Sequence, residues 1–283
     1  MISPYVRRLR LAAELRALRV QAGLTHEELA REIGESRAQI SRLENAHVVD
    51  QADVIKILEA LGVGGDRWTE IMTIAREAGE RGWWETTRGI DRRQATYADL
   101  EAGAATLREF QNSFVPGLLQ TPEFTRARID VQDPAAPPTV AADAGIQART
   151  ARQRMLRRPG GPTYDVILDE VAVRRRAVPP ETAKAQLYHL AARANGDAKT
   201  SLQVLPIDAK IEGYSVPRST FSIYTFSDPK DPNVVMVDTV TEDLMLTDDE
   251  QVKRYDALFE RLRRAALPVE DSLEYIVRTA ADI

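Results

Sequence analysis

The chain of 283 residues contains no cysteine and only three histidines, His26, His47 and His189. The absence of cysteine excludes disulfide scaffolds, thiolate zinc sites, iron–sulfur clusters and cysteine nucleophiles. None of the histidines has a second histidine at ligand spacing, so a metal site would have to consist of carboxylates. The sequence predicts neither a metal nor another cofactor.

Long apolar runs are also missing. No run of 18 apolar residues occurs, and the N-terminal sequence MISPYVRRLRLAAELRALR is too charged for a signal peptide. We therefore expect a cytoplasmic protein without membrane contact. Hydrophobic residues make up 43% and charged residues 29% of the chain, as in ordinary globular proteins, and the length favours two domains.

The charge is unevenly distributed along the chain. Residues 1–49 carry eight arginines and six glutamates, whereas the remaining residues carry 30 basic and 37 acidic side chains. A slightly basic segment attached to an acidic body suits local contact with a polyanion such as DNA. The net charge of −5 argues weakly against a protein that coats nucleic acid.

The first 80 residues show the spacing of short amphipathic helices. Leu11, Leu15, Leu18 and Ala22 recur at intervals of four, three and four residues, which places them on one helix face. Further caps and apolar faces predict a mainly α domain of about five helices. Their expected ranges are 8–22, 25–33, 36–46, 51–61 and 67–77.

The second and third predicted helices, joined by a turn at Gly34, form a helix-turn-helix pattern. Thr25 and Glu28 have the spacing of a capping box. Residues 36–42, SRAQISR, contain two arginines and no carboxylate, as expected of a helix that enters the major groove. The alternative is the solvated face of an ordinary helical bundle.

The segment GLTHEELAREIGESRAQISRLENA resembles the helix-turn-helix of the phage-repressor-like (XRE-type) regulators. The resemblance implies contacts with base edges and nearby backbone for Arg37, Ala38, Gln39 and Arg42. Arg37 and Gln39 have side chains suited to guanine and adenine. It further implies phosphate contacts for Ser36, Ser41 and Asn45, and for His26, which stands where the family usually has glutamine. Finally, it implies an internal salt bridge between Arg19 and Glu44, and it places Ala46 where the family usually has glycine.

Composition changes after GERGWWE, and we expect a linker over residues 81–94 between a DNA-binding domain, 1–80, and a second domain, 95–283. Helical patterns surround several β-branched segments there, which predicts an α+β domain with a small sheet. Helices are expected over 96–110, 121–131, 139–158, 170–176, 181–194, 248–267 and 268–280. Strands are expected over TYDVILD, SLQVLP, STFSIYTF and NVVMVDTV.

No catalytic constellation emerges from the second domain. Asp169 and Glu170 are adjacent acids that fit a helix N-terminus better than a catalytic pair. The basic run RTARQRMLRR is expected to be a solvated face, with DNA phosphates or an acidic partner as alternatives. Phe110, Phe114 and their apolar neighbours suit either a pocket or the core, and the helical segment 251–276 suits either the core or a dimer face. We therefore expect that the protein is not an enzyme.

Several segments, among them FVPGLLQTPEFTRARI and YDVILDEVAVRR, resemble the second domain of actinobacterial regulators called WhiJ-like. The resemblance implies a transcriptional regulator, frequently encoded beside a small partner protein and described as antitoxin-like. We therefore expect a nucleoid-associated, sequence-specific regulator that binds double-stranded operator DNA, as a homodimer because one recognition helix reads few base pairs. Its second domain would serve dimerisation, partner binding or the sensing of an unknown small-molecule effector. The alternative is an antitoxin-like interaction protein that binds a small partner and regulates its own operon.

Overall fold

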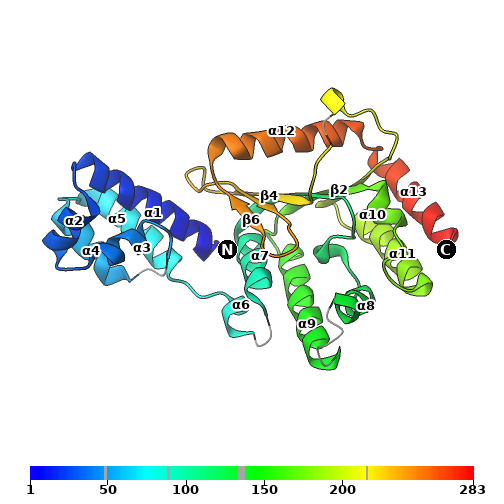
Figure 1. Cartoon of the computed structure of the whole chain (residues 1–283), viewed down its shortest axis with the longest axis horizontal. Coiled ribbons are helices and arrows are strands. Elements are labelled where there is room, and N and C mark those ends of the chain that lie inside the picture. Colours follow the sequence, from blue (N-terminus) through cyan, green and yellow to red (C-terminus); the bar gives the residue numbers. More distant parts are fainter. Residues whose placement is uncertain (48–49, 88–89, 133–137, 215) are drawn as a thin grey trace. The chain divides into compact units, whose positions relative to one another are not determined.

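The computed structural model describes residues 1–47, 50–87, 90–132, 138–214 and 216–283, and the chain divides into two compact units. The first unit consists of Met1–Thr86, Thr96–Gly103 and Phe226–Pro232. The second unit consists of Thr87–Ala95, Ala104–Thr225 and Asn233–Ile283. Figure 1 labels the elements of both units.

The first unit is helical, as the spacing of apolar residues predicts. Its helices are α1 (Pro4–Gln21), α2 (His26–Ile33), α3 (Arg37–Leu43), α4 (Gln51–Ala60), α5 (Gly65–Ala78) and α6 (Trp83–Thr86), with most of α7 (Arg92–Gly103). One core joins α1 to α5 and includes Leu11, Leu29, Ile40, Ile57 and Ile71, each at most 1% exposed. Burial of these faces supplies most of the stability of such short helices.

The second unit surrounds a six-stranded sheet with helices. Its strands are β1 (Ala104–Gln111), β2 (Thr163–Asp169), β3 (Thr200–Leu205), β4 (Phe221–Phe226), β5 (Val234–Val237) and β6 (Leu244–Leu246). Its helices are α8 (Pro122–Gln132), α9 (Pro138–Leu156), α10 (Glu170–Arg174), α11 (Pro180–Gly196), α12 (Asp249–Ala265) and α13 (Val269–Ala281), with the 3₁₀ turns η1 (Gly117–Leu119) and η2 (Glu212–Tyr214). The α+β prediction is therefore confirmed.

The sheet has the order β3-β2-β1-β4-β5-β6 and is mixed. β1, β2 and β3 are parallel, with Phe110 opposite Ile167, and helical crossovers connect them as parallel strands require. β4, β5 and β6 are antiparallel. Thr106 contacts Thr225 and Gln111 contacts Thr220, so β1 and β4 also run in opposite directions.

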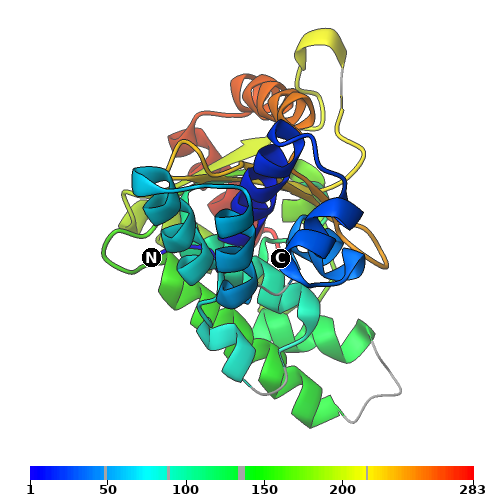
Figure 2. The same cartoon turned by 90° about the vertical axis from the view of Figure 1, so that its left-hand side faces the viewer.

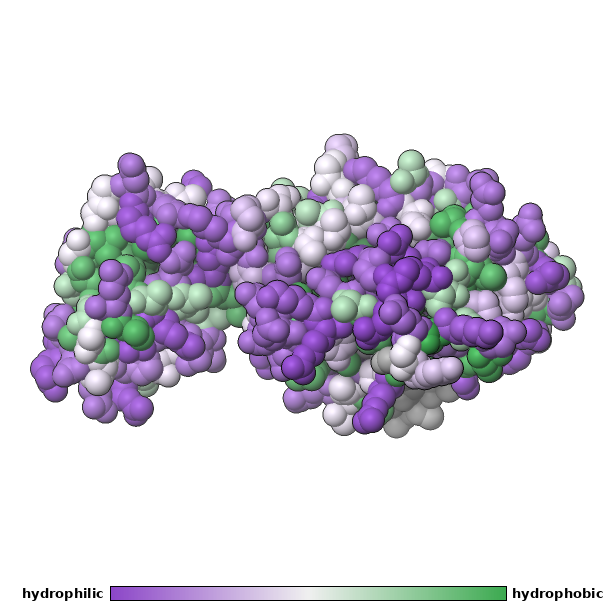
Figure 3. All heavy atoms as spheres, turned by 90° about the horizontal axis from the view of Figure 1, so that it is seen from above, coloured by the Kyte–Doolittle hydropathy of each residue, from purple (hydrophilic) through white to green (hydrophobic). Residues whose placement is uncertain are grey.

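Helices cover both faces of this sheet (Figure 1). Val252, Phe259 and Leu262 of α12 pack on one face, against strand residues that include Phe110 and Phe221. Helices α10, α11 and α13 contact β2 and β3. The view onto α12 shows a mainly hydrophilic outer surface (Figure 3), as expected of an amphipathic helix.

The helix expected over residues 96–110 is wrong in its second half. Helix α7 ends at Gly103, and residues 104–111 form the central strand β1. Leu100, Ala104 and Leu107 have helical spacing, but the strand satisfies its backbone by pairing with β2 and β4 instead. Gly103 is required because a Cβ there would lie 2.3 Å from the backbone nitrogen of Ser3.

Two alternatives left open for the second unit are decided by burial. Phe110 and Leu119 are at most 1% exposed, so they belong to the core and not to an open pocket. Phe259 and Leu262 are fully buried against the sheet, and Tyr255 and Leu258 pack against the same core. The face of α12 considered for dimerisation is thus occupied within the unit. Among the described residues, no helix is long and apolar enough to cross a membrane.

Candidate nucleic-acid interface

A capping box begins α2, and a left-handed glycine ends it at the turn into α3. The backbone N–H of Glu28 donates to Thr25 Oγ1 (3.2 Å), and that of Thr25 donates to Glu28 Oε2 (2.8 Å). Gly34 ends α2 with φ +70°. Glycine adopts this conformation without the cost that a Cβ brings, so the chain can turn directly into α3.

Helix α3 has one buried side and one exposed side. Ile40 and Leu43 are at most 1% exposed and attach the helix to the core. Ser36 caps it by accepting a hydrogen bond from the backbone N–H of Gln39 (3.1 Å). Ser36, Arg37 and Ala38 are exposed. The first turn of α3 therefore presents its polar side chains outward, as contact with a groove requires.

Arg37 extends from this first turn and is 69% exposed. Its Nε lies 3.6 Å from Glu27 Oε1, and Glu27 is equally exposed. Such exposed ion pairs contribute little to stability. Arg37 can therefore exchange Glu27 for a nucleic-acid partner at low cost.

Gln39 and Arg42 are held together by hydrogen bonds within the chain. Gln39 Nε2 donates to Asp53 Oδ2 (2.5 Å), and Arg42 Nη2 donates to Gln39 Oε1 (2.5 Å). Asp53, at the start of α4, is only 7% exposed. These hydrogen bonds join the three residues and orient the Gln39 amide.

Ser41 and Asn45 lie close together near the end of α3. Asn45 Nδ2 donates to the carbonyl oxygen of Ser41 (2.7 Å), with the Ser41 hydroxyl at 3.3 Å. Asn45 is exposed and Ser41 partly buried. Both remain within one turn of Arg42, so a phosphate group could meet them together.

Glu44 is the centre of a buried cluster beneath the turn. Its carboxylate accepts hydrogen bonds from Arg19 Nε (2.6 Å) and Nη2 (2.8 Å), and His26 Nε2 lies 3.0 Å from it. Arg16 Nη2 donates to the Glu44 carbonyl oxygen (2.9 Å). The Glu44 side chain is 1% exposed, whereas that of His26 is 31% exposed.

The cluster holds Glu44 in its charged form. Burial alone would raise the pKa of Glu44, but hydrogen bonds from Arg19 and His26 outweigh it and keep the pKa below its usual value. Glu44 thereby connects α1, α2 and the end of α3. His26 is directed at this carboxylate.

Two residues that hold this candidate interface in place, Asp53 and Arg16, are not indicated by any sequence pattern. Asp53 resembles any first-turn acid of a helix, and nothing local shows that it meets Gln39. Arg16 lies on the outer side of α1, where an arginine is ordinary. Their roles depend on contacts 14 and 28 residues apart in the chain.

The acids Asp169 and Glu170 of the second unit have structural partners. Asp169 caps α10 by accepting from the N–H of Val171 (2.8 Å). Glu170 accepts from the N–H of Ile207 (2.9 Å) and pairs with Arg174 (3.1 Å). Within the described part of the chain, no group of three or more His, Asp or Glu side chains is arranged to hold a metal ion.

Comparison with known families gives two matches. A family model described as helix-turn-helix matches residues 15–68. A second, described as a domain of unknown function (DUF5753), matches residues 94–278, which is more than half of the chain. No curated protein and no solved structure matches the chain. The helix-turn-helix match points to a DNA-binding regulator and not to an enzyme.

Proposed function

We propose that this chain, which belongs to the DUF5753 family and carries the helix-turn-helix of a DNA-binding regulator, is a sequence-specific transcriptional regulator. The observation that carries the proposal is the exposed, acid-free first turn of α3, fixed on the core by Ile40 and Leu43. Figure 2 shows helices α1 to α5 from a second direction.

Arg37, Gln39 and Arg42 are proposed to contact base edges, with Ala38 close to them. Arg37 suits the acceptor pair of guanine, and the Gln39 amide suits adenine. On binding, Gln39 exchanges its bonds with Asp53 and Arg42 for bonds with a base. Because those internal bonds orient the amide beforehand, less side-chain entropy is lost in the complex.

Ser36, Ser41, Asn45 and His26 are proposed to lie near phosphates, which fix the register of the helix without reading sequence. His26 Nε2 would then leave Glu44 or share its proton between the carboxylate and the phosphate. Arg19 continues to neutralise Glu44 in either case.

The finer assignments follow the resemblance to WhiJ-like actinobacterial regulators. The chain is proposed to act in the cytoplasm, on the nucleoid, as a homodimer that reads two half-sites about one helical turn apart. Residues 1–80 would form the DNA-binding domain and 81–94 a linker to the regulatory domain over 95–283. An antitoxin-like role would add a small partner protein that co-purifies with the chain.

The test is selection of genomic DNA fragments by the purified chain at about 150 mM salt, where nonspecific phosphate attraction is weak. We expect a recurring, roughly palindromic motif. Arg37→Ala is expected to cost about 1–3 kcal/mol of binding and to relax one operator position. The Arg37→Ala/Arg42→Ala double variant is expected to lose the motif.

Arg31→Ala is the matched control, because Arg31 is an exposed arginine of α2 outside the proposed reading set. It removes the same charge and is expected to leave the motif intact. Unchanged affinity and selectivity in Arg37→Ala would remove Arg37 from the reading set. Absence of any motif from the folded wild-type chain would contradict the proposed function.

A further inference from the structure

A cavity of about 320 Å³ lies between strands β2 and β3 and the second half of helix α12, within the second unit. Its volume falls at the lower end of the range for small-molecule sites, about 300–1,000 Å³. The polar side chains that line it are Asp165, Ser201, Gln203, Glu260 and Arg263. All of them are at least partly exposed, so the cavity is open to solvent.

The register of the strands places three of these side chains next to one another. Asp165 of β2 is the partner of Ser201 in β3, and Gln203 follows two residues later on the same face. Neighbouring strands are about 4.8 Å apart, so a carboxylate, a hydroxyl and an amide share one small area. Gln203 Nε2 donates to the carbonyl oxygen of Leu267 (2.8 Å), which leaves its Oε1 as an acceptor.

The Asp165 carboxylate has no partner of its own. Within the described part of the chain, no group donates a hydrogen bond to it or lies within ion-pair distance of it. Arg108 and Arg263 act on it electrostatically, but each already pairs with a carboxylate of α12. Arg108 Nη2 lies 2.6 Å from Asp256 Oδ1. Arg263 Nη2 lies 2.6 Å from Glu260 Oε2. Two positive and three negative side chains thus leave one negative charge unmatched, that of Asp165.

Burial opposes this unmatched charge. It raises the pKa of Asp165 above its usual value, and the charges of Arg108 and Arg263 offset that rise only in part. A carboxylate that is partly removed from water without a partner costs stability, and a bound cation would remove that cost. Groups of this kind that face a cavity are typical of binding sites.

We propose that this cavity binds a small organic amine that carries hydroxyl groups and has about the size of a monosaccharide. Asp165 accepts hydrogen bonds from the ammonium group, whose charge matches the unpaired carboxylate. The Ser201 hydroxyl and Gln203 Oε1 hydrogen-bond the hydroxyl groups of the ligand. A divalent metal ion fits less well, because it prefers several oxygen ligands that include carboxylates, and Glu260 is already paired with Arg263.

The role of such an amine as an effector rests on the proposed function, whereas amine binding itself does not. Binding is therefore measured on the full chain without DNA, by isothermal titration calorimetry and by thermal unfolding at neutral pH. The probe is glucosamine hydrochloride, compared with sodium chloride at the same ionic strength. Glucose is the matched ligand control, because it differs from glucosamine only by a hydroxyl group in place of the ammonium group.

We expect glucosamine to raise the Tm beyond the chloride control, as a ligand that binds only the folded state does. Glucose is expected to bind about tenfold more weakly, or weaker still, because it lacks the charged donor. Asp165→Asn should bind both sugars with similar affinity, since it removes the charge that selects the ammonium group. Without ligand, this variant should be at least as stable as the wild type, because its carboxylate has no partner to lose.

Ser201→Ala separates recognition of the hydroxyl groups from recognition of the charge. It is expected to weaken the binding of both sugars alike, by roughly two- to tenfold, as the loss of one neutral hydrogen bond does. The preference for glucosamine over glucose should remain, because Asp165 is unchanged.

Asp208→Asn is the matched control, since Asp208 is an exposed aspartate of the same unit and does not line the cavity. It is expected to retain the wild-type preference for glucosamine. The proposal is overturned if glucosamine does not stabilise the wild-type chain beyond chloride, if glucose binds equally well, or if Asp165→Asn retains the preference. A DNA motif selected by the same chain separates any of these failures from a failure of the proposed function.

Discussion

At the scale of single residues, Asp99 of α7 is the buried acid whose titration should be visible in stability. It is 3% exposed and accepts hydrogen bonds from Ser3 Oγ (2.5 Å) and the N–H of Tyr5 (3.2 Å). Burial nevertheless raises its pKa to about 6, because these bonds and Arg8 at 3.9 Å offset the loss of water only in part.

The direction of the pH effect follows from that shift. The folded chain binds the Asp99 proton more tightly than the unfolded chain, whose pKa is about 3.9. The stability supplied by the protonated form is therefore complete below about pH 4 and is lost as the pH rises to about 6.

Asp99→Asn should remove this loss, because asparagine is neutral and its Oδ1 can still accept from Ser3 and Tyr5. We expect the unfolding free energy of the variant, relative to wild type, to rise from near zero at pH 4 to roughly 3 kcal/mol at pH 7. Urea unfolding at a series of pH values measures it, with the exposed Asp208→Asn as control. A difference that stays constant over this range would contradict the assignment.

Ala46, three residues after the end of α3, has a backbone conformation that should lower the stability of the chain. Its φ of +58° lies in the left-handed region, which disfavours a residue with a Cβ by about 1–2 kcal/mol. The XRE-type resemblance places glycine at this position. The structure thus gives a physical reason for that preference.

We expect Ala46→Gly to raise the unfolding free energy by about 0.5–1 kcal/mol, since the greater freedom of glycine in the unfolded chain offsets part of the relieved strain. Ala257→Gly, at an exposed position within α12, should instead lower it by about 1 kcal/mol. Denaturant titration of both variants provides the comparison. Destabilisation by Ala46→Gly would show that the backbone at this position is not strained.

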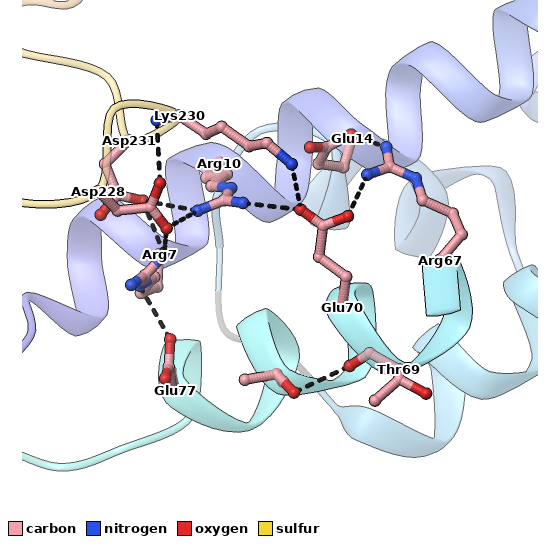
Figure 4. A network of polar contacts seen from close by, with 11 residues as sticks. Arg7, Arg10, Glu14, Arg67, Thr69, Glu70, Glu77, Asp228, Lys230 and Asp231 are labelled. Atoms are coloured by element: carbon pink, nitrogen blue, oxygen red, sulfur yellow. Dashed lines mark hydrogen bonds and ion pairs between the residues drawn. The ribbon is translucent and has the colours of Figure 1, made fainter. Parts of the chain in front are cut away.

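At the scale of elements, the connection between β4 and β5 contributes to the helical unit. Residues 226–232 belong to the first unit although both flanking strands belong to the second. Asp228 and Asp231 meet Arg7 and Arg10 of α1, with Arg10 Nη1 2.5 Å from Asp228 Oδ2 (Figure 4). Arg10 is only 5% exposed, so this loop supplies the charge that a buried arginine needs.

Helix α5 completes the same network. Glu70 bridges Lys230 (2.6 Å) and Arg67 (2.9 Å), and hydrogen bonds from these residues lower its pKa to about 2. A hydrogen bond from the Lys230 N–H, together with Arg10 and Arg7, lowers the pKa of Asp228 to about 2. Both carboxylates therefore stay charged across the physiological range.

Asp228→Asn should destabilise the chain by about 1–3 kcal/mol at pH 7, because Arg10 loses a charged acceptor while remaining buried. Since the pKa of Asp228 is lowered on folding, its contribution is present above about pH 4 and lost as the pH falls toward 2. The deficit of the variant should shrink accordingly in acid. Urea unfolding against Asp208→Asn checks this, and an equal effect of the two substitutions would show that the loop network contributes nothing.

Elements with complete local signals were predictable from the sequence. Helix α2 has its capping box and its terminal glycine within ten residues, and both are observed. Strand β1 has no such signal, because Glu109 and Gln111 are polar yet only 8% exposed. Gln111 donates to Glu109 (2.6 Å), and Tyr164 from β2 donates to the same carboxylate. A burial pattern of this kind depends on the neighbouring strand and not on the residues of β1 themselves.

At the scale of the whole molecule, some features of the candidate interface were predictable from the sequence, whereas others depend on contacts between distant residues. Arg37 and Ser36 could be placed on an exposed first turn because a serine cap and an acid-free stretch are local features. That Gln39 is held by Asp53 could not be predicted, nor that Arg16 contacts the carbonyl oxygen of Glu44. Each of these facts requires two helices, or a helix and a turn, to be brought together.

The sequence by itself determined the class of the protein: a helical unit with a helix-turn-helix, followed by an α+β unit. It did so because caps, glycines and apolar periodicity act within a few residues of the chain. Only the tertiary structure decided the order of the six strands, the place of residues 226–232 in the helical unit and the burial of Glu44 among Arg19, His26 and Arg16. Strand pairing and the burial of charge depend on partners distant in sequence, which local patterns do not encode.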